Sequence, residues 1–269
     1  MIRILAVGDT VGKPGRQACL EIIPRLCQEE QIDFIIINGE NIAGGSSITK
    51  ETVDELFQAG ADVVTTGDHI FKKKEAKDLV EANPRILRPL NYPTGTPGKG
   101  SIVVESKNGI KVGVINVLGR VFMKAVECPF KTVEAELNRI AKKTSVILVD
   151  VHAEATSEKV ALGWFLDGKV SAVFGTHTHV QTADETILPM GTAYITELGM
   201  CGPYDSVIGR KKDVVIRHFL SPLHAYLDVA TDDARISGAI FDIDEKTGRA
   251  LAVKRIHEKL KVESCLKKN

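Results

Sequence analysis

Short, continuous runs of apolar residues alternate with amphipathic stretches through the first two thirds of the chain. Apolar runs of four to eight residues bounded by turn residues are typical of buried strands, and apolar residues spaced three and four apart are typical of helices. The expected strands are residues 2–7, 33–38, 62–66, 145–151, 170–174 and 192–196. The expected helices are residues 16–29, 49–59 with Thr49 as N-cap, a Lys-rich helix from Lys72, 131–143 and 157–166.

Two further pairs of apolar runs are separated by short turns. They are residues 101–105 with 110–117, and 236–243 with 251–256. Asn108-Gly109 lies in the first turn and is a strong hairpin signal. Alternating strands and helices followed by hairpins predict an α/β fold with a mixed sheet, or two sheets packed together. With no repeat or linker in the sequence, we expect a single domain over residues 1–269.

Side chains that can bind metals follow five of the expected strands. They occur in Gly8-Asp9, Gly39-Glu40-Asn41, Gly67-Asp68-His69, Asp150-Val151-His152 and Gly175-Thr176-His177-Thr178-His179. In open α/β sheets, ligands bind beyond the carboxyl ends of the strands. Residues two apart in an extended segment face the same side, so His177 and His179 can converge on one site. The pattern favours an enzyme with a metal centre at this edge.

Each of these side chains also has an ordinary structural explanation when taken alone. Glu40 or Asp68 could cap a helix or face solvent, and His152 could be a hydrogen-bonded core histidine. Their coincidence at strand ends favours the functional interpretation. The other histidines, His218, His224 and His257, follow no such strand and receive no role.

Imidazoles and carboxylates without thiolates suit manganese, iron, zinc or nickel. Seven candidate ligands exceed what one ion needs, whereas two ions about 3.5–4 Å apart, bridged by a carboxylate and a hydroxide, would use them all. Such a pair produces a nucleophile at neutral pH and binds phosphate oxygens. A histidine outside the coordination sphere could protonate the leaving alkoxide. The residues therefore predict phosphoester hydrolysis.

Composition narrows the alternatives. Lys plus Arg and Asp plus Glu both number 35, so no broad charge attracts nucleic acid or an acidic membrane. No apolar run approaches the roughly 18 residues of a membrane span, and the N-terminus lacks a signal-peptide core. The five cysteines are scattered and odd in number, which indicates free thiols in a reducing compartment. We expect a soluble cytoplasmic protein. A homo-oligomer is compatible with the sequence, but no obvious interface stripe supports one.

The sequence gives little support for a glycine-rich loop that binds a dinucleotide or the phosphates of a nucleotide. Residues 8–15 do not match G-x-G-x-x-G. Residues 95–101 lack the spacing of a phosphate loop and precede a strand rather than a helix.

The five polar motifs together resemble those of the calcineurin-like metallophosphoesterases, and more narrowly those of the bacterial YmdB-type family. Further similar stretches are Arg88-Pro89 and residues 95–100, 119–123, 152–159 and 199–206. The resemblance extends from Met1 to Ile256. It implies a four-layer αββα sandwich with two mixed sheets and a dinuclear iron or manganese centre, with zinc as a further option. It also implies phosphodiesterase activity on cyclic nucleotides, particularly 2′,3′-cyclic ones and also 3′,5′-cyclic AMP.

The resemblance assigns a role to each site residue. Asp9, Asn41 and His179 would hold the first metal, and Glu40 would bridge the pair. Asp68, His152 and His177 would hold the second metal. His69 would be the proton donor.

The narrower resemblance is specific, because general metallophosphoesterases carry Asp-x-His at the first motif, where this chain has Asp9-Thr10-Val11. One position departs from the family's pattern, which usually has Asn where this chain has Asp68. We expect the added negative charge to favour a tighter-bound or more highly charged metal and to weaken attraction for the phosphate.

Two other functions remain as alternatives. One is a regulatory protein, associated with RNA-processing factors, whose metal site is structural or senses nucleotide. The other is a metal-free nucleotide-binding protein, which would leave the clustered histidines unexplained. Glu154, Arg120 and Phe122 are candidates for contacts with the substrate or the ligands, although packing and surface hydrogen bonds explain them equally well.

Overall fold

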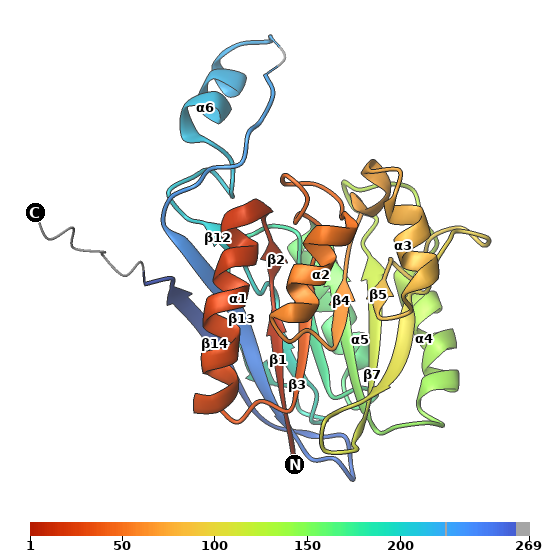
Figure 1. The fold of residues 1–269 in the computed structure, drawn as a ribbon. Helices are drawn as coiled ribbons and strands as arrows, with labels where there is room; N and C mark the ends of the chain where they lie inside the picture. The colour runs from red at the N-terminus through yellow and green to blue at the C-terminus, as the bar shows by residue number, and fades with distance from the viewer. Residues whose placement is uncertain (224, 262–269) are drawn as a thin grey trace, which may run out of the picture.

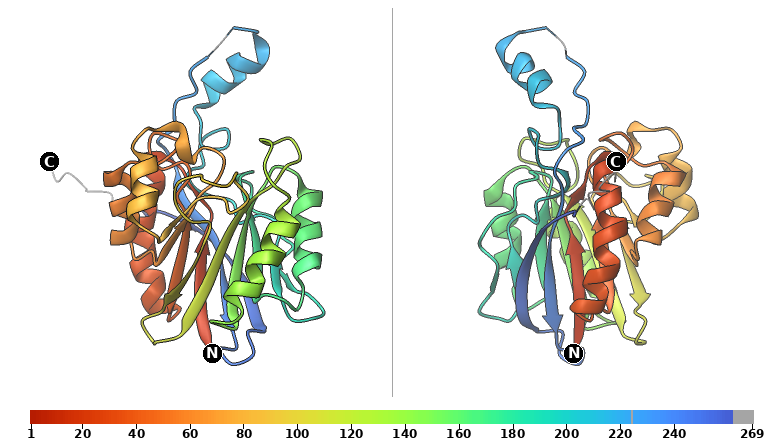
Figure 2. Two further views of the ribbon diagram at one scale, coloured as in Figure 1. Left: turned by 90° about the vertical axis from the view of Figure 1, so that its right-hand side faces the viewer. Right: turned by 60° about the vertical axis from the view of Figure 1, so that its left-hand side comes forward.

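The protein is described here by a computed structural model that covers residues 1–223 and 225–261. Two β-sheets pack face to face, and helices cover the outer face of each (Figures 1 and 2). The larger sheet contains β1 (Ile2–Val7), β2 (Asp9–Thr10), β3 (Phe34–Asn38), β4 (Val63–Thr65), β5 (Ile86–Leu87), β12 (Met200–Pro203), β13 (Ala234–Ile243) and β14 (Ala250–Lys259). Its order is β2-β12-β13-β1-β3-β4-β5, with β14 paired to β13.

The smaller sheet packs against the larger one. It contains β6 (Ser101–Glu105), β7 (Lys111–Leu118), β8 (Val146–His152), β9 (Ala172–Thr176), β10 (Thr186–Ile187) and β11 (Ala193–Ile195), in the order β10-β11-β9-β8-β7-β6. The helices are α1 (Gly12–Glu29), α2 (Lys50–Gln58), the 3₁₀ turn η1 (Ile70–Lys72), α3 (Ala76–Ala82), α4 (Pro129–Ile140), α5 (Thr156–Leu166) and α6 (Lys212–Leu220).

Alternate residues of the central strands enter different cores. Ile4 of β1 and Phe34 of β3 belong to the core between the sheets, while Leu5 and Ile35 belong to the core under the first helices. Successive side chains of a strand point to opposite faces, so a strand buried on both faces is apolar throughout. A third core lies between the smaller sheet and helices α4 and α5. The expected four-layer αββα sandwich is confirmed.

Parallel pairing of the strands determines which edge of the sandwich carries the side chains that follow them. β1, β3, β4 and β5 are parallel neighbours, as are β7, β8, β9 and β11. Their carboxyl ends therefore lie at one edge of the sandwich, the upper edge in Figure 1. β13 and β6 run antiparallel, so both sheets are mixed, as expected. α6 projects beyond this edge in Figures 1 and 2.

Most expected elements are confirmed, and Thr49 caps α2 through a capping box with Thr52. The Lys-rich helix expected from Lys72 is wrong, because η1 ends there and extended backbone at Lys73 separates it from α3. The short strands β2, β5, β10 and β12 and the helix α6 were not expected.

Cysteine and surface features agree with the composition. Cys19, Cys27, Cys128 and Cys201 are free thiols, as expected, while Cys265 and His224 lie outside the described residues.

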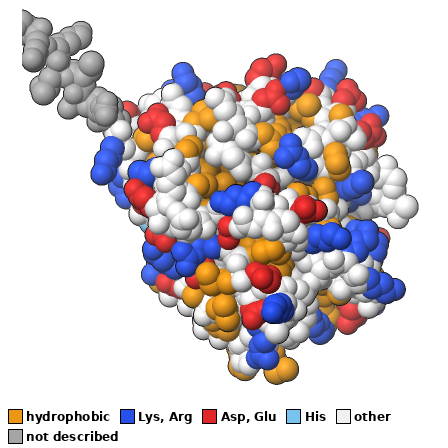
Figure 3. Space-filling view, turned by 60° about the horizontal axis from the view of Figure 1, so that its bottom comes forward, with side chains coloured by type: hydrophobic (Ala, Val, Ile, Leu, Met, Phe, Trp, Pro, Cys, Tyr) orange, Lys and Arg blue, Asp and Glu red, His pale blue; other side chains and the backbone are white. Residues whose placement is uncertain are grey.

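No helix in the described ranges has the length and apolar character that crossing a membrane requires. On the face toward the N-terminal end, basic and acidic side chains are interspersed (Figure 3).

Candidate metal centre

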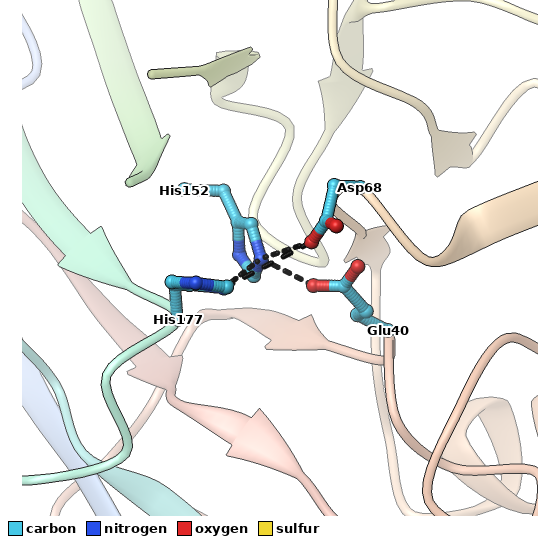
Figure 4. Close-up of side chains that lie close together, drawn as sticks. All are labelled: Glu40, Asp68, His152 and His177. Carbon is cyan, nitrogen blue, oxygen red and sulfur yellow. Dashed lines mark hydrogen bonds and ion pairs between the residues drawn. The ribbon is translucent and has the colours of Figure 1, made fainter. Parts of the chain in front are cut away.

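Four ligand side chains converge at the carboxyl edge of the two sheets. Glu40 follows β3, Asp68 follows β4, His152 ends β8 and His177 follows β9. One ligand atom from each lies within 4.8 Å of the others, and all four point toward one another (Figure 4). Two residues come from each sheet, so packing of the sandwich creates the cluster.

Asp9, Asn41 and His179 form a second group beside the first. His179 Nε2 lies 3.7 Å from Asp9 Oδ1 and 3.3 Å from Asn41 Nδ2. Asp9 Oδ1 also lies 3.9 Å from Nδ1 of His152, which belongs to the first group. The structure thus places the seven expected metal ligands in two adjoining groups.

His69 borders both groups. Its Nδ1 lies 3.2 Å from Asn41 Oδ1 and 3.8 Å from Glu40 Oε1, and its Nε2 lies 3.6 Å from Asp68 Oδ2. The ring is partly exposed, whereas Glu40 is fully buried. His69 is therefore placed to meet a ligand that enters from solvent.

Within the two ligand groups, three buried carboxylate oxygens lack hydrogen-bond partners among the described residues. They are Asp9 Oδ1, Glu40 Oε2 and Asp68 Oδ1. Glu40 Oε2 touches the ring of His152 without accepting a hydrogen bond from it. Burial of an unpartnered carboxylate is costly unless a cation or a donor compensates it. Oxygen and imidazole ligands without thiolates suit a transition metal, so these residues fit the metal centre that the sequence predicts.

The charges of the cluster also suit a cation. Burial raises the pKa values of Glu40 and Asp68, but contacts with His152 outweigh burial and hold both pKa values below their usual range. Burial likewise opposes protonation of His152, yet Glu40 and Asp68 raise its pKa well above 6.5. Burial and the neighbouring His152 lower the pKa of His177 to about 3. Without metal, therefore, His152 carries a proton that a metal would displace.

A buried polar chain orients His152. Thr176 Oγ1 donates to Asp150 Oδ1 at 2.7 Å and lies 2.9 Å from Nδ1 of His152. A hydroxyl has one proton, so Thr176 accepts from Nδ1–H and leaves Nε2 to face the cluster. Thr65 also donates to Asp150, at 2.5 Å, and burial raises the pKa of Asp150 to about 6.

A buried ion pair supports the segment that carries the last two histidines. Lys159 Nζ lies 2.5 Å from Glu197 Oε2, which also accepts hydrogen bonds from the backbone and hydroxyl of Thr178. This pairing could not be predicted from the sequence, because Lys159 and Glu197 are 38 positions apart and no pattern connects them.

Tight backbone geometry shapes the centre. A Cβ on Gly67 would lie 2.2 Å from the His152 ring, so only glycine allows the approach. His177 and His179 have φ of 104° and 65°, so the extended conformation expected for this segment is wrong. The two rings consequently enter different groups. Unfavourable backbone conformations of this kind concentrate at functional sites.

Comparisons with known proteins agree with this geometry. The profile of the family described as YmdB-like protein matches residues 5–256. The chain belongs to the YmdB-like family. A 2′,3′-cyclic-nucleotide 2′-phosphodiesterase of Bacillus subtilis is 47% identical over 255 residues, which are 95% of this chain and 96% of that protein.

Two solved structures share the fold. A hypothetical protein from Thermus thermophilus has a TM-score of 0.90 at 39% identity, covering 96% of this chain and 99% of that one. A novel phosphatase from Mycoplasma pneumoniae has a TM-score of 0.90 at 33% identity, covering 96% and 93%. The family expected from the motifs is thus confirmed.

Proposed function

We propose that this protein is a metal-dependent phosphodiesterase that hydrolyses 2′,3′-cyclic nucleotides. The supporting observation is the convergence of buried carboxylates and imidazoles, in which three carboxylate oxygens of the ligand groups have no hydrogen-bond partner among the described residues. The Bacillus subtilis relative is named for hydrolysis of this substrate class and aligns over nearly the whole chain.

Two transition-metal ions fit the two groups of ligands. Asp9, Asn41 and His179 would hold one ion, Asp68, His152 and His177 the other, and Glu40 would bridge them. Iron and manganese suit this donor set, as does zinc. Bound metals would lower the pKa of a coordinated water and neutralise charge on phosphate oxygens during in-line displacement.

His69 would act on the leaving group. Cleavage of the 2′ ester releases the ribose 2′-oxygen, which needs a proton as the bond to phosphorus breaks. His69 reaches both ligand groups, and its partly exposed ring can meet the substrate. Burial lowers the pKa of His69 below 6.5, although Glu40 and Asp68 oppose this effect. The donor form is therefore more abundant in mildly acidic solution.

A paired measurement of metal content and turnover tests the proposal. Protein purified without added metal or chelator is analysed for bound metals, then assayed with 2′,3′-cyclic AMP and 3′,5′-cyclic AMP. We expect about two transition-metal ions per chain and turnover of the 2′,3′-cyclic substrate. His69→Ala should retain metal and lose about 10²–10⁴-fold in kcat.

The outcomes separate this function from the alternatives. Bound metal without turnover of either substrate favours the regulatory, nucleotide-sensing function. If the protein binds no metal after manganese or iron is supplied, the proposal of a metal centre is wrong. Comparable turnover of both isomers would extend the activity to 3′,5′-cyclic AMP.

A further inference from the structure

The loop formed by residues 119–124 contacts the candidate metal centre at both of its ends. It follows β7 at the carboxyl edge of the smaller sheet (Figure 2). At one end, the Gly119 backbone donates to the carbonyl of His152 at 2.9 Å. At the other end, Lys124 Nζ donates to the carbonyl of Asp68 and lies 3.9 Å from its Oδ2. Both ends of the loop therefore contact residues assigned to metal binding.

Glu158 fixes the backbone of this loop. Its buried carboxylate accepts hydrogen bonds from the amides of Arg120, at 3.0 and 3.1 Å, and Val121, at 3.3 Å. A turn closes the loop, with the Met123 amide donating to the carbonyl of Arg120 at 3.3 Å. The charge-assisted bonds hold the loop in one conformation.

Phe122 lies at the tip of this fixed loop. Its side chain is 89% exposed, and its φ of 61° is in the left-handed region. A bulky residue at positive φ is a genuine outlier, and such conformations persist where the surroundings enforce them. A single exposed apolar residue would be ordinary on a protein surface. An exposed aromatic residue with an unfavourable backbone conformation, between two contacts to a candidate active site, favours a functional explanation.

We propose that Phe122 is the platform on which the nucleobase of a cyclic nucleotide stacks while its phosphate occupies the metal centre. This assignment rests on the proposed function. Phe122 lies two residues from Lys124 and three from Gly119, so the chain confines its Cα to within about 11 Å of the Gly119 Cα. An exposed ring can accept a base without displacing packed side chains. Bases splayed out of a stack are commonly held on aromatic side chains in this way.

The chemistry of the ring also predicts the base preference. Phenylalanine has no hydrogen-bonding group, so stacking on it accepts any base. We expect 2′,3′-cyclic AMP and 2′,3′-cyclic CMP both to be substrates, with the lower KM for the larger purine. Because stacking acts at a distance from the reacting phosphorus, it should affect KM rather than kcat.

The test compares substrates with and without a base. KM and kcat are measured on the metal-loaded enzyme with 2′,3′-cyclic AMP and with methyl riboside 2′,3′-cyclic phosphate, which has no base. The variants are Phe122→Ala and Phe122→Trp. The matched control is Trp164→Ala, which removes an aromatic side chain that is 57% exposed near the carboxyl end of α5, at the opposite edge of the sheet.

We expect Phe122→Ala to raise the KM for 2′,3′-cyclic AMP about tenfold, which corresponds to about 1.4 kcal/mol and lies within the range for base stacking. It should leave both constants for the base-free substrate unchanged. Phe122→Trp should retain the wild-type KM, and Trp164→Ala should change neither constant.

Two results would overturn the assignment while the proposed function stands. One is equal wild-type KM values for the nucleotide and the base-free substrate. The other is the same effect of Phe122→Ala on both substrates, which would indicate a structural role for the loop. If the metal-loaded wild type hydrolyses neither substrate, the proposed function and this assignment both fail.

Discussion

The ion pair between Lys159 and Glu197 offers a sharp test of how the fold holds the candidate centre. The two side chains are 2% and 1% exposed, and their charged atoms lie 2.5 Å apart. Glu197 also binds Thr178, which lies between His177 and His179. Lys159→Met keeps an apolar chain of similar length and removes only the cation. The carboxylate of Glu197 is then left buried without a counter-charge.

The hydrogen bonds that Glu197 retains determine how much stability Lys159→Met loses. Removal of one partner from a buried ion pair costs about 3–5 kcal/mol. Glu197 would keep hydrogen bonds from the Thr178 amide at 3.2 Å, the Thr178 hydroxyl at 2.8 Å and the Gly199 amide at 3.3 Å. These bonds compensate part of the charge, so we expect the lower end, about 3 kcal/mol. At about 2 °C per kcal/mol for a chain of this size, Tm should fall by about 6 °C.

Thermal unfolding of metal-free protein measures this loss through a double-mutant cycle. The variants are Lys159→Met, Glu197→Gln and the double variant. Because the double variant buries no unpaired charge, it should be more stable than the sum of the single effects predicts, by about 2 kcal/mol. As a control, Lys50→Met removes a cation from the exposed pair with Asp54 and should leave Tm unchanged.

Metal affinity provides a second measurement on the same variants. Lys159→Met should weaken metal binding, because Glu197 loses the cation that holds it in place, and Thr178 and the adjoining histidines are then oriented less firmly. Additive effects in the cycle, or a loss below about 1 kcal/mol for Lys159→Met, would refute the reasoning.

Three further predictions follow from the charges of the centre. The kcat should begin to fall below pH 6.5 and continue to fall as pH rises, because burial lowers the pKa of His69 below 6.5 and the protonated donor form is lost. A flat profile from about pH 5 to about pH 8 would contradict this role. Metal binding at neutral pH should release about one proton per chain, since the pKa of His152 is raised well above 6.5. Calorimetry in buffers of different ionisation enthalpy measures the number of protons released, and His152→Gln should abolish the release. Asp68→Asn should weaken metal binding about tenfold and lower the KM for the phosphodiester; unchanged metal content and turnover would refute the charge argument.

The sequence predicts the layers and the location of the centre because both depend on local patterns. Three successive isoleucines in β3 show burial on both faces, and Gly39-Glu40-Asn41 marks the end of that strand. β2 and β12 could not be predicted in this way. They are two and four residues long, and β2 pairs with a segment about 190 positions away.

The contacts between distant side chains could not be predicted from the sequence either. Lys159 and Glu197 each look like an ordinary surface charge in the sequence, and only the fold buries them together. The positive φ of His177, His179 and Phe122 has no sequence signal either, because these residue types rarely adopt it. Local patterns therefore located the candidate site, whereas tertiary packing determined its detailed geometry.

The position of β13 in the larger sheet has a consequence for biosynthesis. β13 lies between β12 and β1, and Ile2 pairs with Ile243. Chains emerge from the ribosome N-terminus first, at about 5–20 residues per second. β1 therefore has only β3 as a sheet partner until residues 234–243 have been made, and the strand that carries Asp9 waits for β12. Asp9, the first of the expected ligands to be synthesised, is among the last to be fixed in place.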